Sequence, residues 1–237
     1  HKKKKKKKKK HTHTHQDSRL FSIMSHMMDF GSLGLGVDLE EEEEEEEENE
    51  WDIDDSLPPI EKLRKYIESP LIMHRLYLVK ELGETARAVG YDDTIKELLP
   101  LLHRLSEDAE QVIRQASIEQ IPDLVAVLLK DPTKADDTCL QVLQTHLLPL
   151  VAKRARDPNP TTRTAAVNAL AQLAELTHHW QSMKDQIFTI VTTLAADEVE
   201  EEHVVEAAQL VFKCAHAFGH QMMIERCIPL IQTLSAN

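Results

Sequence analysis

The sequence predicts an all-α fold, an α-α superhelix of about four and a half stacked helix pairs. The first observation is a repeat: Leu98-Leu99-Pro100-Leu101 recurs 49 residues later as Leu147-Leu148-Pro149-Leu150, a spacing typical of stacked helix pairs. The second is composition, because only 6 glycines and 4% aromatic residues favour helix over sheet. The third is periodicity, since leucine, alanine and valine recur every three or four positions, as on one face of a helix.

Residues 1–55 are predicted to form a disordered leader before a helical array at 56–237. Lys2–Lys10 and Glu40–Glu48 are runs of like charge, which repel themselves and form no core. We interpret the lysine run as sequence upstream of the natural start rather than a nucleic-acid patch, because it carries no information beyond charge. For the acidic stretch Trp51–Asp55 three interpretations are open: docking in a partner's groove, folding back onto the array, or plain disorder.

The charge distribution disfavours some partners. The net charge is −13, and residues 1–26 contribute +9 (nine lysines and Arg19 against Asp17), so the rest of the chain carries −22. An acidic body repels nucleic acid and favours basic or mixed-charge protein surfaces. No apolar run approaches the ~18 residues of a membrane span, so we expect none. The three cysteines are far apart and form no CxxC, which favours a reducing compartment, the cytoplasm and also the nucleus.

The first helix pair follows from its breakers and caps. Pro59 opens the first helix, and Ser69-Pro70 ends it and starts the second, with Ser as N-cap and Pro at the first helical position. The second helix runs to Val89, where Gly90 stops it. Apolar residues at helical spacing give both helices one face that can be buried.

The second pair contains a proline inside each predicted helix. Its helices span about 92–105, capped by Asp92 or Asp93, and 109–129. Pro100 and Pro122 lie in their interiors, where proline removes a backbone donor and its ring clashes with the preceding turn. We therefore expect a bend at each proline.

Two further pairs and the start of a fifth complete the array. Their predicted helices are Asp136–Arg156, Pro160–Leu176, Met183–Ala195 and Glu201–Phe218. The inward stripe of the last of these helices is expected to be Val204, Val205, Ala208, Val211 and Phe212. Gly219 ends that helix, and Ile228-Pro229-Leu230 opens a fifth pair that lacks its second helix. We therefore expect a fragment of a longer array.

Acidic and basic residues recur at the turns inside the pairs. Asp108 and Asp157 come just before second helices, where a carboxylate meets free backbone N–H groups and the positive end of the helix. Arg114 and Arg163 each follow six residues later. Stacking of the pairs brings these residues into a ladder between repeats; alternatively, they and the adjoining turns face a bound partner.

The pattern Leu-Leu-Pro-Leu, then Asp, Arg and Ala, resembles a HEAT repeat, and residues 57–237 resemble five of them, the last incomplete. Together with Pro59–Tyr66, Ile121-Pro122 and the passage from Gly219 to Leu230, the array resembles the regulatory-subunit-1 family of serine/threonine protein phosphatase 4. The resemblance implies a HEAT/armadillo-type solenoid. It also implies a non-catalytic regulatory or scaffold subunit that binds a catalytic subunit like that of protein phosphatase 2A, of the protein phosphatase 4 type, and directs its substrate choice.

No arrangement of residues predicts catalysis, a cofactor or a metal site. Neither paired carboxylates nor a nucleophile with its base stand together in the pattern. His216 and His220 are four residues apart, but Gly219 lies between them and no HExxH glutamate accompanies them. We interpret these histidines as a helix-end pair with His216 partly buried.

We expect the turns inside the pairs to line one ridge that contacts the partner. The candidate partner-binding residues are Glu107, Asp108, Arg114, Asp157, Asn159, Arg163, Glu200 and Glu201. Many weak rim contacts along an array add up to a specific interface without one deep pocket. The implied partners are a serine/threonine phosphatase catalytic subunit and the substrates of that phosphatase. The alternatives are a fragment of a karyopherin-type transport receptor, whose acidic inner surface grips basic signals, and a general HEAT platform for protein interaction.

Overall fold

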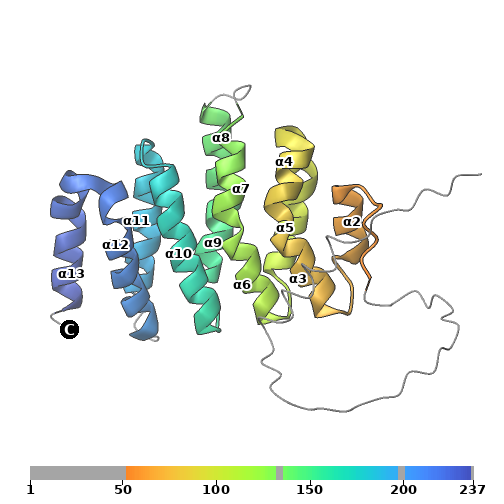
Figure 1. The fold of residues 1–237 in the computed structure, drawn as a ribbon. Helices are drawn as coiled ribbons and strands as arrows, with labels where there is room; N and C mark the ends of the chain where they lie inside the picture. Colours follow the sequence, from red (N-terminus) through yellow and green to blue (C-terminus); the bar gives the residue numbers. More distant parts are fainter. Residues whose placement is uncertain (1–51, 132–135, 197–200, 236–237) are drawn as a thin grey trace, which may run out of the picture. The chain divides into compact units, whose positions relative to one another are not determined.

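A computed structural model of the chain describes residues 52–131, 136–196 and 201–235. Within these ranges the chain forms helices and turns and no strand. The helices stand side by side in pairs (Figure 1), so the all-α solenoid that the repeat predicts is confirmed. Most of the predicted leader, up to residue 51, lies outside the described residues.

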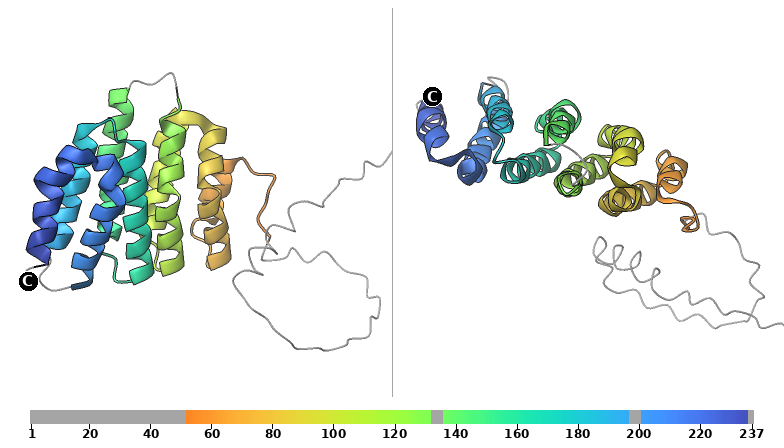
Figure 2. Two further views of the ribbon diagram at one scale, coloured as in Figure 1. Left: turned by 60° about the vertical axis from the view of Figure 1, so that its left-hand side comes forward. Right: turned by 90° about the horizontal axis from the view of Figure 1, so that it is seen from above.

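The helices form two layers, which the right-hand view of Figure 2 shows end-on. The first layer holds α2 (Pro59–Tyr66), α5 (Leu99–Ser106), α8 (Asp136–Val142), α9 (Leu148–Arg154), α11 (Gln181–Ala195) and α13 (Ile228–Leu234). The second layer holds α3 (Ile72–Lys80), α4 (Leu82–Asp93), α6 (Gln111–Glu119), α7 (Ile121–Leu128), α10 (Pro160–Leu176) and α12 (Glu201–Met222). The turns inside the pairs lie along one edge, the lower edge in Figure 1.

The second layer carries a continuous interior. α10 packs against α6 and α7 on one side and against α12 on the other. Ala165 and Ala166 of α10 are buried, and small side chains of this kind let neighbouring helices approach closely. Leu170 and Leu173 fill the space between the layers, and each fully buried leucine contributes about 1.5–3 kcal/mol.

One turn of π-helix precedes the proline of three first-layer helices. The π-turns are Thr94–Leu98, Leu143–Leu147 and Met223–Cys227. In the first of them the N–H of Leu99 bonds to the carbonyl of Thr94, five residues back instead of four. Pro100 follows at once, and because it has no N–H and its ring crowds the turn before it, the wider π-turn relieves the clash. The bend that the sequence predicted at Pro100 therefore takes the form of a π-turn.

Two glycines separate a second-layer helix from the next first-layer helix. Gly90 has φ 81° and ψ −177°, and Gly219 has φ 77° and ψ 170°. This backbone region is essentially open to glycine alone. Each glycine lies four residues before a π-turn, so the chain reverses in the same way at both places. The helix stops predicted at Gly90 and Gly219 are confirmed.

Two second-layer helices that were predicted as continuous are interrupted. The first breaks at Glu81, whose N–H bonds to the carbonyls of Tyr77 and Leu78 in a tightened turn. The second breaks at Gln120, where Pro122 at the second position of α7 has no N–H to continue the ladder. The predicted bend at Pro122 is therefore confirmed. The break at Glu81 was not predicted, because no proline lies near it in the sequence.

Two predicted helix caps are wrong. The helix after the first turn begins at Ile72, and the Ser69 hydroxyl accepts a hydrogen bond from the N–H of Leu71 at 3.2 Å, ahead of the helix. Asp92 and Asp93 follow the kink at Gly90, and Asp93, directly before the first π-turn, makes no side-chain capping hydrogen bond. The positive φ of Gly90 sets the start of the next helix.

The residues just before α2 contact that helix. The backbone N–H of Asp54 donates to the Tyr66 hydroxyl at 2.9 Å. Asp55 pairs with Lys62 at 2.6 Å. Contacts with the array therefore begin before residue 56, the start that the sequence predicted, while Trp51 lies outside the described residues.

Candidate partner-binding surface

The turns inside the second and third pairs share one construction. Asp108 and Asp157 each accept a hydrogen bond from the backbone N–H two residues ahead, that of Glu110 at 2.8 Å and that of Asn159 at 3.0 Å. The Asn159 side chain caps α10 by accepting from the N–H of Thr161 at 2.9 Å. The predicted use of these aspartates and of Asn159 at helix starts is confirmed.

In three second-layer helices, α3, α6 and α10, an arginine reaches an acidic residue of the next pair, and we call these contacts the arginine ladder. Its rungs are Arg75–Asp108, Arg114–Asp157 and Arg163–Glu206. In the middle rung, Nε and Nη2 of Arg114 donate to the two carboxylate oxygens of Asp157 at 2.9 and 3.0 Å, a bidentate pair. Nη1 of Arg114 donates to the carbonyls of Asp108 and Ala109 at 3.0 and 2.9 Å. One guanidinium therefore joins its own turn to the next.

The two outer rungs differ in their acceptors. Arg75 donates to both oxygens of Asp108, at 2.8 and 3.2 Å. Arg163 donates to Glu206 at 2.6 Å and also to Glu202, so a helix supplies the acceptors instead of a turn aspartate. The ladder between repeats that the sequence predicted is present. Arg75 and the two glutamates are members that sequence reasoning missed.

Asp157 is the electrostatic centre of the ladder. Its side chain has no exposed surface, yet it accepts hydrogen bonds from Arg114, from Arg154 at 3.1 Å and from the Asn159 N–H. Burial by itself raises the pKa of Asp157, but these hydrogen bonds outweigh it and lower the pKa to about 2. The carboxylate is therefore charged at neutral pH.

The ladder encloses half of the eight candidate partner-binding residues. These are Asp108, Arg114, Asp157 and Arg163. Of the others, Asn159 is half-buried as the cap of α10, and Glu201 is exposed in the first turn of α12. Glu200 lies outside the described residues. The structure gives the four enclosed residues a role between repeats, and their contact with a partner stays a prediction.

Glu107 lies beside the middle rung and is partly exposed. It pairs with Lys153 at 2.6 Å and with Arg154 at 2.6 Å. Burial raises the pKa of Glu107, but the hydrogen bonds from these two cations outweigh it and hold the pKa below its usual range. The turn therefore presents a paired, mixed-charge surface rather than a bare acidic one.

The predicted inward stripe of α12 is wrong in three positions. Val205 is 57% exposed, Phe212 is 82% exposed, and Ala208 is exposed as well. We call these three residues the α12 stripe. The physical reason is that α10 and α11 cover only two sides of α12, and the buried face runs instead through residues such as Ala207 and Leu210. The α12 stripe is an apolar surface on the same helix as the acceptors of the third rung.

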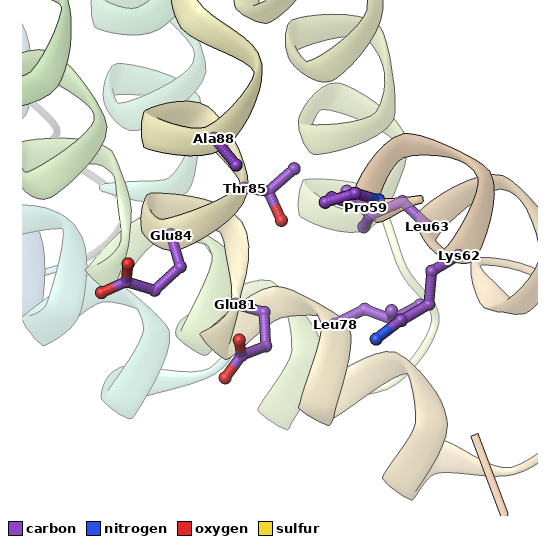
Figure 3. A pocket seen from close by; sticks show the side chains of 8 residues that line it. All are labelled: Pro59, Lys62, Leu63, Leu78, Glu81, Glu84, Thr85 and Ala88. Atoms are coloured by element: carbon purple, nitrogen blue, oxygen red, sulfur yellow. The ribbon is translucent and has the colours of Figure 1, made fainter. Parts of the chain in front are cut away.

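A pocket of about 260 Å³ opens between α2 and α4 (Figure 3). It is lined by Pro59, Lys62, Leu63, Leu78, Glu81, Glu84, Thr85 and Ala88. Figure 3 shows the two glutamates on one side of the pocket and Lys62 on the other. Sequence reasoning missed this pocket, because no residue of the pattern marks it.

The described residues show neither a metal cluster nor a membrane-spanning helix. In the three described ranges no three histidine, cysteine, aspartate or glutamate side chains gather where they could hold a metal ion. None of the helices described there has both the length and the apolar character needed to cross a membrane. His216, predicted to be partly buried, is exposed and pairs with Glu175 at 2.9 Å.

One HEAT repeat and a distant similarity to three proteins were found for this chain. Residues 147–177 match the HEAT repeat. That segment is the pair α9 and α10, which contains the middle rung's Asp157. Serine/threonine-protein phosphatase 4 regulatory subunit 1 of Rattus norvegicus is 23% identical over 178 residues, and that of Homo sapiens is 24% identical over 179. Each alignment covers 74% of this chain and 18% of the relative.

A third relative aligns over a shorter stretch. A serine/threonine-protein phosphatase 4 regulatory subunit 1-like protein of Homo sapiens is 31% identical over 106 residues, which is 44% of this chain and 25% of that protein. The chain therefore spans between 18% and 25% of the length of these relatives. It is an all-α solenoid with a HEAT repeat at residues 147–177, and it is similar to phosphatase regulatory subunits.

Proposed function

We propose that this chain is part of a non-catalytic regulatory subunit that binds a serine/threonine phosphatase catalytic subunit of the protein phosphatase 4 type and directs its substrate choice. The observation that carries the proposal is the similarity, over 74% of the chain, to two proteins named as regulatory subunit 1 of that phosphatase. We also propose the cytoplasm and the nucleus as its location. Cys139, Cys214 and Cys227 are buried free thiols, which suits a reducing compartment.

Buried and exposed residues of the ridge have different tasks in this proposal. Arg114 and Asp157 hold neighbouring turns at a fixed spacing, because they are enclosed and bonded to each other. The partner contacts the exposed side chains of the same turns, such as Glu110 and Glu201. Charged rim contacts of this kind contribute mainly to association rate and specificity.

The α12 stripe supplies an apolar anchor for the same partner. A few buried aromatic residues usually carry most of the energy of an interface, and charged rim residues carry less. Phe212 is 82% exposed and thus has most of its surface available for burial against a partner or against a further helix of the array. We therefore assign the larger share of the binding energy to the α12 stripe. The turns determine where along the array the partner binds.

Capture of the purified protein phosphatase 4 catalytic subunit on the immobilised chain tests the proposal. We expect binding at low salt that weakens about tenfold or more in Phe212→Ser and a few-fold in Glu110→Lys. Glu61→Lys, an exposed charge reversal on α2 away from both surfaces, is the matched control and is expected to bind as the unmodified chain does. Absence of capture by the unmodified chain at low salt contradicts the proposal.

A further inference from the structure

The first helix pair is incomplete on one side. α2 has 8 residues, whereas α11, the first-layer helix of the fourth pair, has 15. α2 begins at Pro59, and the residues before it turn back so that the Asp54 N–H reaches Tyr66 at the other end of the helix. Among the described residues nothing continues α2 beyond Pro59, and the pocket between α2 and α4 opens at that place (Figure 3).

A small side chain helps to keep the pocket open. The second-layer helices of the first two pairs break at Glu81 and Gln120, which gives an offset of 39 residues between these pairs. In this register Thr85 corresponds to Leu124, which is 1% exposed. The second pair therefore has a leucine at this position, where the first pair has the smaller Thr85.

The floor of the pocket is apolar. Leu63 and Leu78 are each 1% exposed, and Ala88 and the Pro59 ring complete the apolar lining. The volume of about 260 Å³ lies just below the ~300–1,000 Å³ of small-molecule sites. The space therefore suits one long side chain rather than a cofactor.

The rim of the pocket carries negative charge that is free to bind a cation. Lys62 is paired with Asp55 at 2.6 Å and is also attracted by the charge of Glu81, so the rim has two carboxylates for one cation that is held elsewhere. Within the part of the chain that the structure describes, no hydrogen bond or ion pair holds the Glu81 carboxylate. Among the described residues Glu84 pairs only with Arg87 of its own helix, and an exposed pair of this type is weak and easily exchanged.

We propose that this pocket binds a lysine or arginine side chain from a basic peptide segment of a partner protein. The aliphatic stem lies against the exposed Pro59 ring and Ala88, and the cation meets the carboxylates of Glu81 and Glu84. Long cationic side chains bury their stems on apolar surface and keep the charge at a polar edge. The negative net charge of the chain attracts such a segment.

Fluorescence anisotropy of a labelled peptide with the full chain at low salt tests this. The probe is a ten-residue peptide of alanine and serine with two lysines, and its partner probe has both lysines acetylated, which keeps the stems and removes the charges. We expect the lysine peptide to bind about fivefold or more tightly than the acetylated one, as direct carboxylate contacts predict. Equal binding of the two peptides overturns the proposal.

Two variants place the binding in the pocket. Glu81→Gln removes the unpaired charge, and Thr85→Leu copies Leu124 and fills the space; each is expected to remove the preference for the lysine peptide. Glu61→Gln changes the net charge equally but does not line the pocket, and is expected to keep the preference. Circular dichroism melts confirm that each variant is folded. Unchanged binding in Glu81→Gln, or an equal loss in Glu61→Gln, overturns the proposal.

Discussion

Replacement of Asp157 by asparagine perturbs the arginine ladder with little change of shape. Asparagine keeps an oxygen for the N–H of Asn159 but removes the charge that faces Arg114 and Arg154. The Asp157 side chain has no exposed surface, and those of Arg114 and Arg154 are 13% and 9% exposed. The variant therefore leaves two largely buried guanidinium groups without their shared counter-charge.

The structure gives the size of the effect in two ways. The surroundings of Asp157 lower its pKa from 3.8 to about 2, and each pKa unit corresponds to about 1.4 kcal/mol, so they favour the charged form by roughly 2 kcal/mol. Removing one partner of a buried ion pair costs about 3–5 kcal/mol. Because Glu107 still pairs with Arg154 at 2.6 Å, we expect a loss of about 2–3 kcal/mol in the free energy of unfolding.

Urea unfolding followed by circular dichroism measures this loss, and hydrogen exchange locates it. We expect faster exchange at the starts of α6 and α10, which the middle rung joins, and little change in α13. Asp185→Asn is the matched control, since it breaks an exposed pair with Arg226 and should cost less than about 1 kcal/mol. If Asp157→Asn were no more destabilising than this control, the ladder could not be what holds the repeats together.

Three further predictions concern pH, backbone and surface. The pKa of Asp157 is about 2 in the folded protein and 3.8 in the unfolded chain, so its contribution to the free energy of unfolding is fully present above about pH 5 and is lost as the pH falls from about 4 to 2. The free energy of unfolding in urea should therefore fall less steeply in Asp157→Asn over that pH range. Gly90→Ala puts a Cβ at φ 81° and should cost about 1–3 kcal/mol by calorimetry, whereas Gly83→Ala, a helical position with no atom nearer than 3.8 Å, should be neutral or stabilising by up to about 1 kcal/mol. Phe212→Ser should change stability by less than about 0.5 kcal/mol and reduce self-association in light scattering; a large loss of stability would mean that the ring is packed in a core.

The ladder could be predicted from the sequence where the repeat is regular. Asp108 and Asp157, with an arginine six residues after each, share one offset of 49 residues, so an ungapped comparison finds them. Arg75 was missed although it makes the same contacts. It lies 39 residues before Arg114, and this shorter spacing removes it from the ungapped comparison. The helix breaks at Glu81 and Gln120 have the same offset of 39 residues. An alignment of these breaks, instead of the amino-acid sequence, pairs Arg75 with Arg114.

The exposed face of α12 could not be predicted from its own sequence. Val205 and Phe212 repeat at helical spacing, as do Leu210 and Cys214, so the helix has two apolar stripes. Which stripe is buried depends on the positions of α10 and α11, and that information lies in the packing of other segments. The π-turns are similar, because proline predicts a disturbed helix but not the wider turn that accommodates it.

Residues that set the spacing of repeats and residues that touch a partner give the same loss in a binding assay, so binding alone does not tell them apart. Arg114→Ala removes the hydrogen bonds to Asp157, Asp108 and Ala109, and it should therefore lower both stability and affinity. Glu110→Lys alters an exposed turn side chain, and it should lower affinity while the unfolding midpoint in urea stays within error. If Arg114→Ala reduced affinity with no change in stability, the guanidinium would belong to the interface itself. The ladder would then be a contact surface, and the exposed turn residues would only surround it.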